Sequence, residues 1–191
     1  MFPDFKELLE LLNKNKVKYL VVGGYAVSLH AQPRATKDLD ILILPSAKNA
    51  DAVFRALQEF GAPLKTRTLD NTSPKGPART LTANDFKDRG TWYTMGVPPV
   101  AIDILTEIPG VSFGAAWKNR VTSVIDVSVG LTANFIARDD LIAAKLASGR
   151  LRDLADVEEL RAAQASQSTG PTGQRPPKSR KPKSPLQSKK T

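Results

Sequence analysis

The sequence contains no cysteine and a single histidine, His30, among its 191 residues. The absence of cysteine excludes disulfides, thiolate zinc sites, iron–sulfur clusters and cysteine nucleophiles. A lone histidine argues against a histidine-rich metal site and against a Ser-His-Asp triad. Any chemistry must therefore use carboxylates, lysine, arginine or a bound metal ion.

Long apolar runs are also absent, because no run approaches the 18 residues that a membrane span requires. Residues 1–6 lack the basic and apolar regions of a signal peptide. The apolar content of 41% and the charged content of 25% are typical of a globular domain. We therefore expect a cytoplasmic protein that does not contact a membrane.

The net charge of +9 is unevenly distributed along the chain. Residues 165–191 are rich in proline and serine and contain no acidic residue, and their seven basic residues are Arg175, Lys178, Arg180, Lys181, Lys183, Lys189 and Lys190. With one large apolar side chain, this segment cannot bury enough surface to fold. We expect a disordered basic tail, either a solvated extension or a contact for RNA or another polyanion.

Residues 1–164 form one predicted domain in which helices and strands are mixed, an α/β class. Apolar periodicity and capping signals predict helices over 3–12, 25–31, 46–61, 139–147 and 151–163. Apolar β-rich runs predict strands over 17–22, 39–44, 100–105, 121–127 and 131–136, with weaker ones near 80–82 and 92–95. We place His30 in the last turn of a short helix and do not expect it to be a ligand.

Two consecutive glycines, Gly23 and Gly24, separate the first predicted strand from the helix that follows. Such a pair lets the backbone turn tightly and approach a ligand closely. The N–H groups at the start of the next helix would then face an anion. The alternative is a tight turn without any ligand.

Asp38 and Asp40 lie two residues apart at the start of a predicted strand. Because strand side chains alternate, both carboxylates point to one face, about 7 Å apart, while Leu39, Ile41 and Ile43 point into a core. Adjacent carboxylates repel each other unless a positive charge lies between them. A divalent cation with oxygen ligands meets that need, and a solvated strand start is the alternative.

Asp103 interrupts an otherwise apolar strand, Val100 to Leu105. A carboxylate there is costly unless it is paired or bound to a metal ion. A salt bridge with Arg34 or Arg89 is the alternative to metal binding.

These motifs together resemble the nucleotidyltransferase superfamily of DNA polymerase beta, whose pattern is Gly-Gly or Gly-Ser, then Asp-x-Asp, then a distant third Asp. Here the matching residues are Gly23-Gly24-Tyr25-Ala26, Asp38-Leu39-Asp40 and Asp103. Over about residues 15–160 the chain is similar to small bacterial nucleotidyltransferases that include abortive-infection toxins and aminoglycoside nucleotidyltransferases. The resemblance implies a mixed β-sheet with flanking helices, two C-terminal helices and then the tail.

The resemblance also implies roles for individual residues. Asp38, Asp40 and Asp103 would ligate two Mg²⁺ ions, and Asp103 would also act as the general base for the acceptor hydroxyl. Gly23 and Gly24 would lie against the phosphates of the nucleotide.

Two basic residues have a role implied by the resemblance and an alternative one. Arg34 would orient or neutralise the carboxylates, or form a simple salt bridge. Lys145, on the penultimate helix, would reach the triphosphate, or would snorkel to solvent. The charged residues that follow it are interpreted as mostly structural: Arg150, Arg152, Asp153 and Asp156.

Residues 62–98 are longer and more irregular than a minimal enzyme of this kind needs. They would carry residues that bind the acceptor, with candidates Arg67, Lys75, Arg79, Trp92 and Tyr93. Stacking of Trp92 and Tyr93 on a base is one interpretation. We favour the other, in which both pack in the core.

The activity that the resemblance implies is Mg²⁺-dependent transfer of a nucleoside monophosphate from a nucleoside triphosphate to a hydroxyl acceptor. We expect RNA or protein as the acceptor, as for the toxin of a toxin–antitoxin system with an antitoxin protein as partner. Antibiotic modification is the second enzymatic interpretation. A non-catalytic module that binds nucleotide or RNA is the third, and the three intact carboxylates argue against it.

Overall fold

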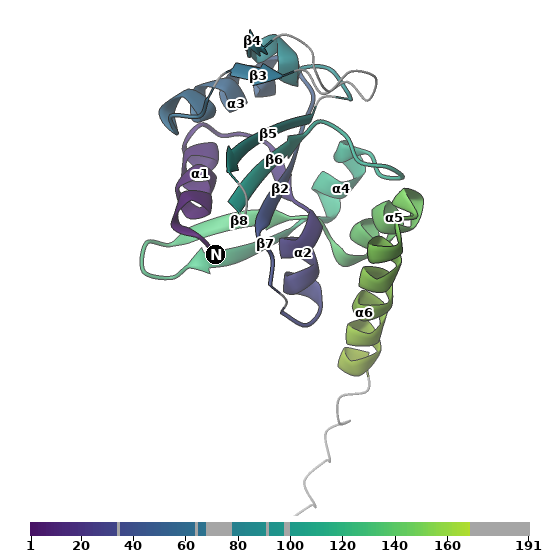
Figure 1. Cartoon of the computed structure of the whole chain (residues 1–191). Coiled ribbons are helices and arrows are strands. Elements are labelled where there is room, and N and C mark those ends of the chain that lie inside the picture. Colours follow the sequence, from purple (N-terminus) through teal and green to yellow (C-terminus); the bar gives the residue numbers. More distant parts are fainter. Residues whose placement is uncertain (34, 64, 68–77, 91, 98–99, 169–191) are drawn as a thin grey trace, which may run out of the picture.

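The computed structural model describes residues 1–33, 35–63, 65–67, 78–90, 92–97 and 100–168 (Figure 1). Its helices are α1 (Pro3–Lys14), α2 (Gly23–His30), α3 (Ala47–Glu59), the 3-10 helix η1 (Ala83–Phe86), α4 (Phe113–Asn119), α5 (Arg138–Ser148) and α6 (Leu151–Ser168). Its strands are β1 (Tyr19–Val21), β2 (Asp38–Ile43), β3 (Lys65–Arg67), β4 (Ala78–Thr80), β5 (Trp92–Val97), β6 (Val100–Leu105), β7 (Val121–Asp126) and β8 (Leu131–Phe135).

Six strands form one mixed sheet in the order β5-β6-β2-β1-β8-β7. Strands β2 and β6 run parallel, as do β1 and β8, while the other neighbours in the sheet run antiparallel. Strands β3 and β4 form a separate antiparallel pair. The predicted α/β class with a mixed sheet is therefore confirmed.

Helices cover the sheet from both sides: Figure 1 shows α1 and α3 on one side and α2, α5 and α6 on the other. Helix α1 begins with Pro3 and buries the apolar stripe that its sequence predicts, Phe5, Leu8, Leu9 and Leu12. Helix α3 begins after Ser46, whose hydroxyl accepts a hydrogen bond from the N–H of Asn49. These two helices bury one face of the sheet, and the cleft described below lies between the other face and α5.

The last helix extends further than the sequence predicts, to Ser168 instead of Ala163. The predicted tail therefore begins inside α6, because the stretch that follows Ala163 contains no helix breaker before Gly170. Residues 169–191 lie outside the described residues, so their predicted disorder stays a prediction. None of the helices in the described part of the chain is long and apolar enough to cross a membrane.

Helix α4 was not predicted, because its seven residues are too short to show a helical period. It begins at a local signal, the Ser112 hydroxyl, which accepts a hydrogen bond from the N–H of Ala115. The helix then buries Phe113 and Ala116.

Candidate active site

Strands β2 and β6 bring two of the three predicted carboxylates side by side. The register pairs Asp40 with Asp103, and Asp38 lies one step earlier on the same face of β2. Neighbouring strands lie about 4.8 Å apart, so residues in register are direct neighbours. Burial alternates as expected, since Leu39 and Ile41 are fully buried. We call Asp38, Asp40 and Asp103 the carboxylate cluster.

The surroundings of Asp40 disfavour its ionised form. Burial raises the pKa of Asp40 to about 6, and the charges of Asp103 and Asp38 act in the same direction. The positive charge of Lys145 and a hydrogen bond from the Gly24 N–H lower the pKa of Asp40, but they do not outweigh burial and repulsion. A cation bound between these carboxylates would relieve both costs.

A threonine that the sequence did not reveal holds Asp103. The register of β5 and β6 pairs Thr94 with Asp103, and the Thr94 hydroxyl donates a hydrogen bond of 2.5 Å to Asp103 Oδ1. Strand pairing alone brings these two side chains together. The predicted salt bridge is thus not needed to explain how Asp103 is accommodated in an apolar strand.

The two glycines are required by side chains that approach them closely. Gly23 has a φ of +59°, and a Cβ there would lie 1.9 Å from Asp40 Oδ2. A Cβ on Gly24 would lie 2.8 Å from Thr36 Cγ2. The two glycines form the start of α2, two residues earlier than the sequence predicts, and this start packs directly against the carboxylate cluster. Contact of these glycines with phosphates stays a prediction.

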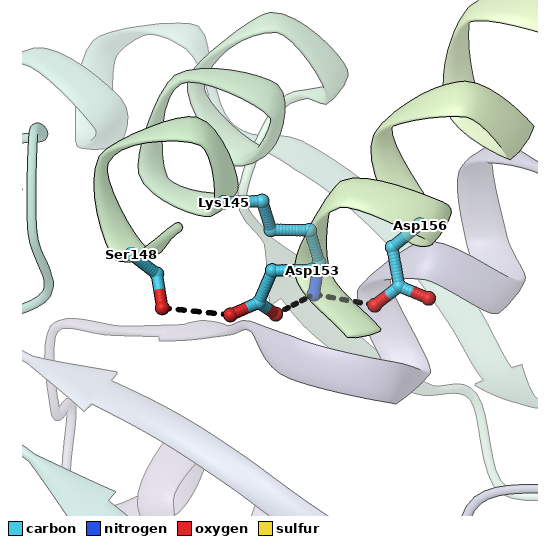
Figure 2. A network of polar contacts seen from close by, with 4 residues as sticks. All are labelled: Lys145, Ser148, Asp153 and Asp156. Atoms are coloured by element: carbon cyan, nitrogen blue, oxygen red, sulfur yellow. Dashed lines mark hydrogen bonds and ion pairs between the residues drawn. The ribbon is translucent and has the colours of Figure 1, made fainter. Parts of the chain in front are cut away.

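Lys145 is held by two carboxylates at the turn between the last two helices (Figure 2). Its Nζ donates to Asp153 Oδ1 at 2.9 Å and to Asp156 Oδ2 at 2.6 Å. The Ser148 hydroxyl donates to the other oxygen of Asp153 at 2.7 Å. Gly149, in the left-handed conformation with a φ of 66°, ends α5 and lets α6 turn back. We call Lys145, Ser148, Asp153 and Asp156 the Lys145 network.

The ammonium group of Lys145 does not snorkel to solvent, because the residue is only 8% exposed. Burial alone would raise the pKa of Asp153, but hydrogen bonds from Ser148 and Lys145 and nearby positive charges outweigh it and lower this pKa. The structural interpretation of Asp153 and Asp156 agrees with these contacts. Contact of Lys145 with a triphosphate stays a prediction.

A cleft of about 690 Å³ joins the carboxylate cluster to the Lys145 network. Its lining includes Gly23, Asp40, Trp92, Leu105, Glu107, Asp103, Lys145, Ser148, Arg150 and Asp153. The cleft therefore contains carboxylates on its sheet side and a lysine and an arginine on its helical side.

The prediction that Trp92 and Tyr93 both pack in the core is wrong for Trp92. Tyr93 is 2% exposed and its hydroxyl donates to the carbonyl of Pro63 at 2.7 Å, whereas Trp92 is 52% exposed and lines the cleft. Neighbouring residues of a strand face opposite sides, so only one of the two reaches the core.

The other predicted residues are either outside the described residues or away from the cleft. Arg34 and Lys75 fall outside the described residues, and so do the side chains of Arg67 and Arg79. His30 ends α2, as predicted, and its Nε2 lies 2.8 Å from the carbonyl oxygen of Ile136.

The donor set of the carboxylate cluster fits a divalent cation such as Mg²⁺, which prefers oxygen ligands. In the described residues, however, no three His, Asp or Glu side chains are already gathered closely enough to hold a metal ion. The arrangement thus provides the ligand types on adjacent strands without a preformed cage.

Comparison with protein families decides the family. The family described as "Nucleotidyltransferase of unknown function (DUF6036)" matches residues 2–165. The chain belongs to this nucleotidyltransferase family. The carboxylate cluster and the Lys145 network both lie within the matched residues.

Solved structures with a similar fold include an antigenic nucleotidyltransferase-like protein from Paracoccidioides brasiliensis, with 16% identity, a TM-score of 0.49 and coverage of 85% of this chain and 84% of that one. A putative nucleotidyltransferase from Thermotoga maritima has 14% identity, a TM-score of 0.46 and coverage of 86% and 90%. The lincosamide antibiotic adenylyltransferase LnuA has 15% identity, a TM-score of 0.48 and coverage of 85% and 98%. No curated protein matches the chain.

Proposed function

We propose that this nucleotidyltransferase transfers a nucleoside monophosphate from a nucleoside triphosphate to a hydroxyl acceptor, with Mg²⁺ bound at the carboxylate cluster. The observation that carries the proposal is the register of Asp40 with Asp103 on parallel neighbouring strands, inside a cleft. Two carboxylates brought together at the floor of a cleft are costly for folding, and a role in binding explains why they are there.

The residues of the carboxylate cluster would have different roles in this reaction. Asp38, Asp40 and Asp103 would hold the Mg²⁺ ions. When bound, Mg²⁺ neutralises the triphosphate and favours ionisation of the acceptor hydroxyl. Asp103 accepts the proton of the acceptor hydroxyl while the oxygen of that hydroxyl forms a bond to the α-phosphorus. The bond from the α-phosphorus to the bridging oxygen of the leaving pyrophosphate breaks in the same displacement.

The phosphates of the nucleotide would lie between the start of α2 and Lys145. Gly23 lines the cleft at the start of α2, and Lys145 supplies a positive charge from α5. The Lys145 network holds this ammonium group in place through hydrogen bonds to Asp153 and Asp156. Lys145 and Asp40 line the same cleft, so one ligand bound there could contact both groups.

The acceptor that we propose is RNA. Residues 165–191 carry seven basic residues and no acidic one, which favours a polyanionic partner over a protein or an antibiotic. A toxin that modifies RNA, with an antitoxin protein as partner, is the biological role that agrees with this chemistry.

The test is incubation of the protein with Mg²⁺, each α-³²P-labelled nucleoside triphosphate and total RNA, followed by gel analysis of the RNA. We expect label in RNA with the wild type and none with Asp103→Asn. Asp51→Asn, which removes an exposed carboxylate on α3 outside the cleft, serves as the matched control and should label RNA normally.

Parallel reactions with cellular protein and with aminoglycosides identify the other acceptors. Label in either of these and not in RNA would contradict the RNA acceptor. Nucleotide binding without transfer to any acceptor would contradict catalysis and favour the binding module.

A further inference from the structure

Trp92 occupies a position on the sheet that its neighbours define. The register places Thr94 beside Asp103 and Trp92 beside Leu105, and the Thr94–Asp103 hydrogen bond shows that Thr94 and Asp103 share a face. Because strand faces repeat every two residues, Trp92 and Leu105 lie on that same face, one step of about 7 Å from Asp103. Both line the cleft.

The order of the strands places Trp92 and Gly23 on opposite sides of the carboxylates. In the sequence β5-β6-β2-β1, Gly23 follows β1, the carboxylates of the cluster lie on β2 and β6, and Trp92 lies on β5. Trp92 and Gly23 are therefore on opposite sides of the Asp40–Asp103 pair. If the phosphates lie beside Gly23, as the proposed function states, the acceptor must approach Asp103 from the side of Trp92.

An exposed indole at that place is suited to one kind of acceptor. Trp92 is 52% exposed, whereas the next residue of the strand, Tyr93, faces the core and is almost completely buried. A large apolar ring in a cleft gains free energy when another flat ring covers it, and nucleobases stack on tryptophan regardless of their sequence. A serine or threonine of a protein acceptor offers no ring to cover the indole.

We propose that Trp92 binds the acceptor by stacking on the terminal base of single-stranded RNA, whose ribose hydroxyl then lies at Asp103. This inference rests on the proposed function and adds to it the residue that selects the acceptor. The bond changes are those given above, with the ribose oxygen as the attacking atom and its proton passing to Asp103.

Fluorescence tests the contact without any need for transfer. The chain has two tryptophans, and Trp117, which stacks on Phe113 outside the cleft, can be replaced by Trp117→Phe. In this variant Trp92 is the remaining tryptophan. We expect a single-stranded RNA oligonucleotide to quench its fluorescence, and ATP with Mg²⁺ to leave it nearly unchanged.

Two results of this titration would overturn the inference. Quenching by ATP alone to the same extent would place Trp92 at the nucleotide instead of the acceptor. RNA that binds, as followed by the anisotropy of a label on the RNA, without quenching Trp92 would show that no base stacks there. RNA that does not bind at all would overturn it as well.

Variants separate this inference from the proposed function. We expect Trp92→Leu to raise the KM for RNA about tenfold or more and to leave the KM for the nucleoside triphosphate unchanged, since each stacked base contributes about that much binding. Trp92→Phe, which keeps a ring, should retain most of the affinity. Val124→Ala is the control, because Val124 is an exposed apolar residue on β7, at the opposite edge of the sheet.

The outcomes are distinguishable. Transfer to RNA that Trp92→Leu leaves unchanged would overturn the inference and keep the proposed function. Quenching of Trp92 by RNA in a protein that transfers nothing would overturn the proposed function and keep the contact. Transfer to protein and not to RNA would overturn the inference.

Discussion

The carboxylate cluster and the Lys145 network are two groups of charges that border the same cleft, but only the Lys145 network contains a cation among its members. In the Lys145 network, two carboxylates share one ammonium group, and the pKa of Asp153 is lowered despite burial. In the carboxylate cluster, burial and two like charges raise the pKa of Asp40 to about 6. The same residue type thus behaves in opposite ways a short distance apart.

The difference lies in where the cation comes from. The Lys145 network contains its own cation, so it is complete as folded and serves to hold α5 against α6. Among the residues that the structure describes, the carboxylate cluster contains none, and we propose that a cation from solution relieves its repulsion. A protein that retains such an unbalanced group loses stability there, which is the usual cost of a functional site.

The largest effect on activity is expected from neutralising Asp40 in the carboxylate cluster. Asp40→Asn removes a proposed metal ligand at the centre of the carboxylate cluster. We expect transfer to fall at least about a thousandfold, or about 4 kcal/mol of transition-state stabilisation, while the fold is kept. Rates of label transfer under single-turnover conditions, with circular dichroism to check folding, measure this. Activity within tenfold of the wild type would be incompatible with metal binding at Asp40.

Removing the cation of the Lys145 network should have the opposite consequence, a loss of stability. Lys145→Met removes the ammonium group that Asp156, which is 1% exposed, contacts at 2.6 Å, and we expect a loss of about 3–5 kcal/mol in the free energy of unfolding. Denaturant unfolding measures the loss. Lys118→Met, on the exposed surface of α4, should change stability by less than about 0.5 kcal/mol.

A second substitution sharpens this prediction. Adding Asp156→Leu to Lys145→Met should restore part of the stability, because the buried carboxylate that lost the Lys145 ammonium group is then removed as well. If Lys145→Met alone is as stable as the wild type, the Lys145 network is not the clamp between α5 and α6 that its contacts indicate.

The pH dependence of stability distinguishes the two groups in the wild-type protein. Because the pKa of Asp40 is raised from 3.8 to about 6 in the folded state, the folded protein binds the extra proton between these values. Without metal, ionisation of Asp40 should therefore lower the free energy of unfolding by about 2 kcal/mol as the pH rises from 4 to 7.

Asp40→Asn should lose this contribution and be more stable than the wild type at pH 7 without metal. Thermal unfolding in the presence of EDTA across this pH range measures it. Identical pH profiles for the two proteins would show that Asp40 carries no such repulsion.

The smallest effect is expected at Thr94, which positions Asp103 through one hydrogen bond. Thr94→Val should lower kcat about tenfold and leave the KM for the nucleoside triphosphate nearly unchanged, since a hydrogen bond to a charged group contributes about 1.5–3 kcal/mol at most. Thr94→Ser keeps the hydroxyl and should restore kcat. A change confined to KM would assign Thr94 to substrate binding instead.

Much of this site follows from local rules of the sequence. Alternation along β2 places Asp38 and Asp40 on one face and Leu39 in the core, and the structure agrees. The same rule shows that Trp92 and Tyr93 cannot both be buried from one strand, a signal that our assignment of both to the core overlooked.

Other features depend on partners that are distant in sequence. The pairing of Asp40 with Asp103 needs strand order, which no local pattern contains. The partners of Lys145 lie eight and eleven residues away, beyond the turn at Gly149, and not at the spacing of one helical turn. Thr94 is recognisable only after the register of β5 and β6 is known.

The most direct test of the central claim is the binding of Mg²⁺ to the carboxylate cluster, measured by thermal unfolding at pH 7.5 over a range of Mg²⁺ concentrations. For the wild type we expect stabilisation that grows with concentration, reaching about 2.7 kcal/mol at a hundred times the Kd. Asp51→Asn should behave like the wild type, and Asp40→Asn should show no stabilisation. Equal stabilisation of Asp40→Asn, or none in the wild type, would contradict the account.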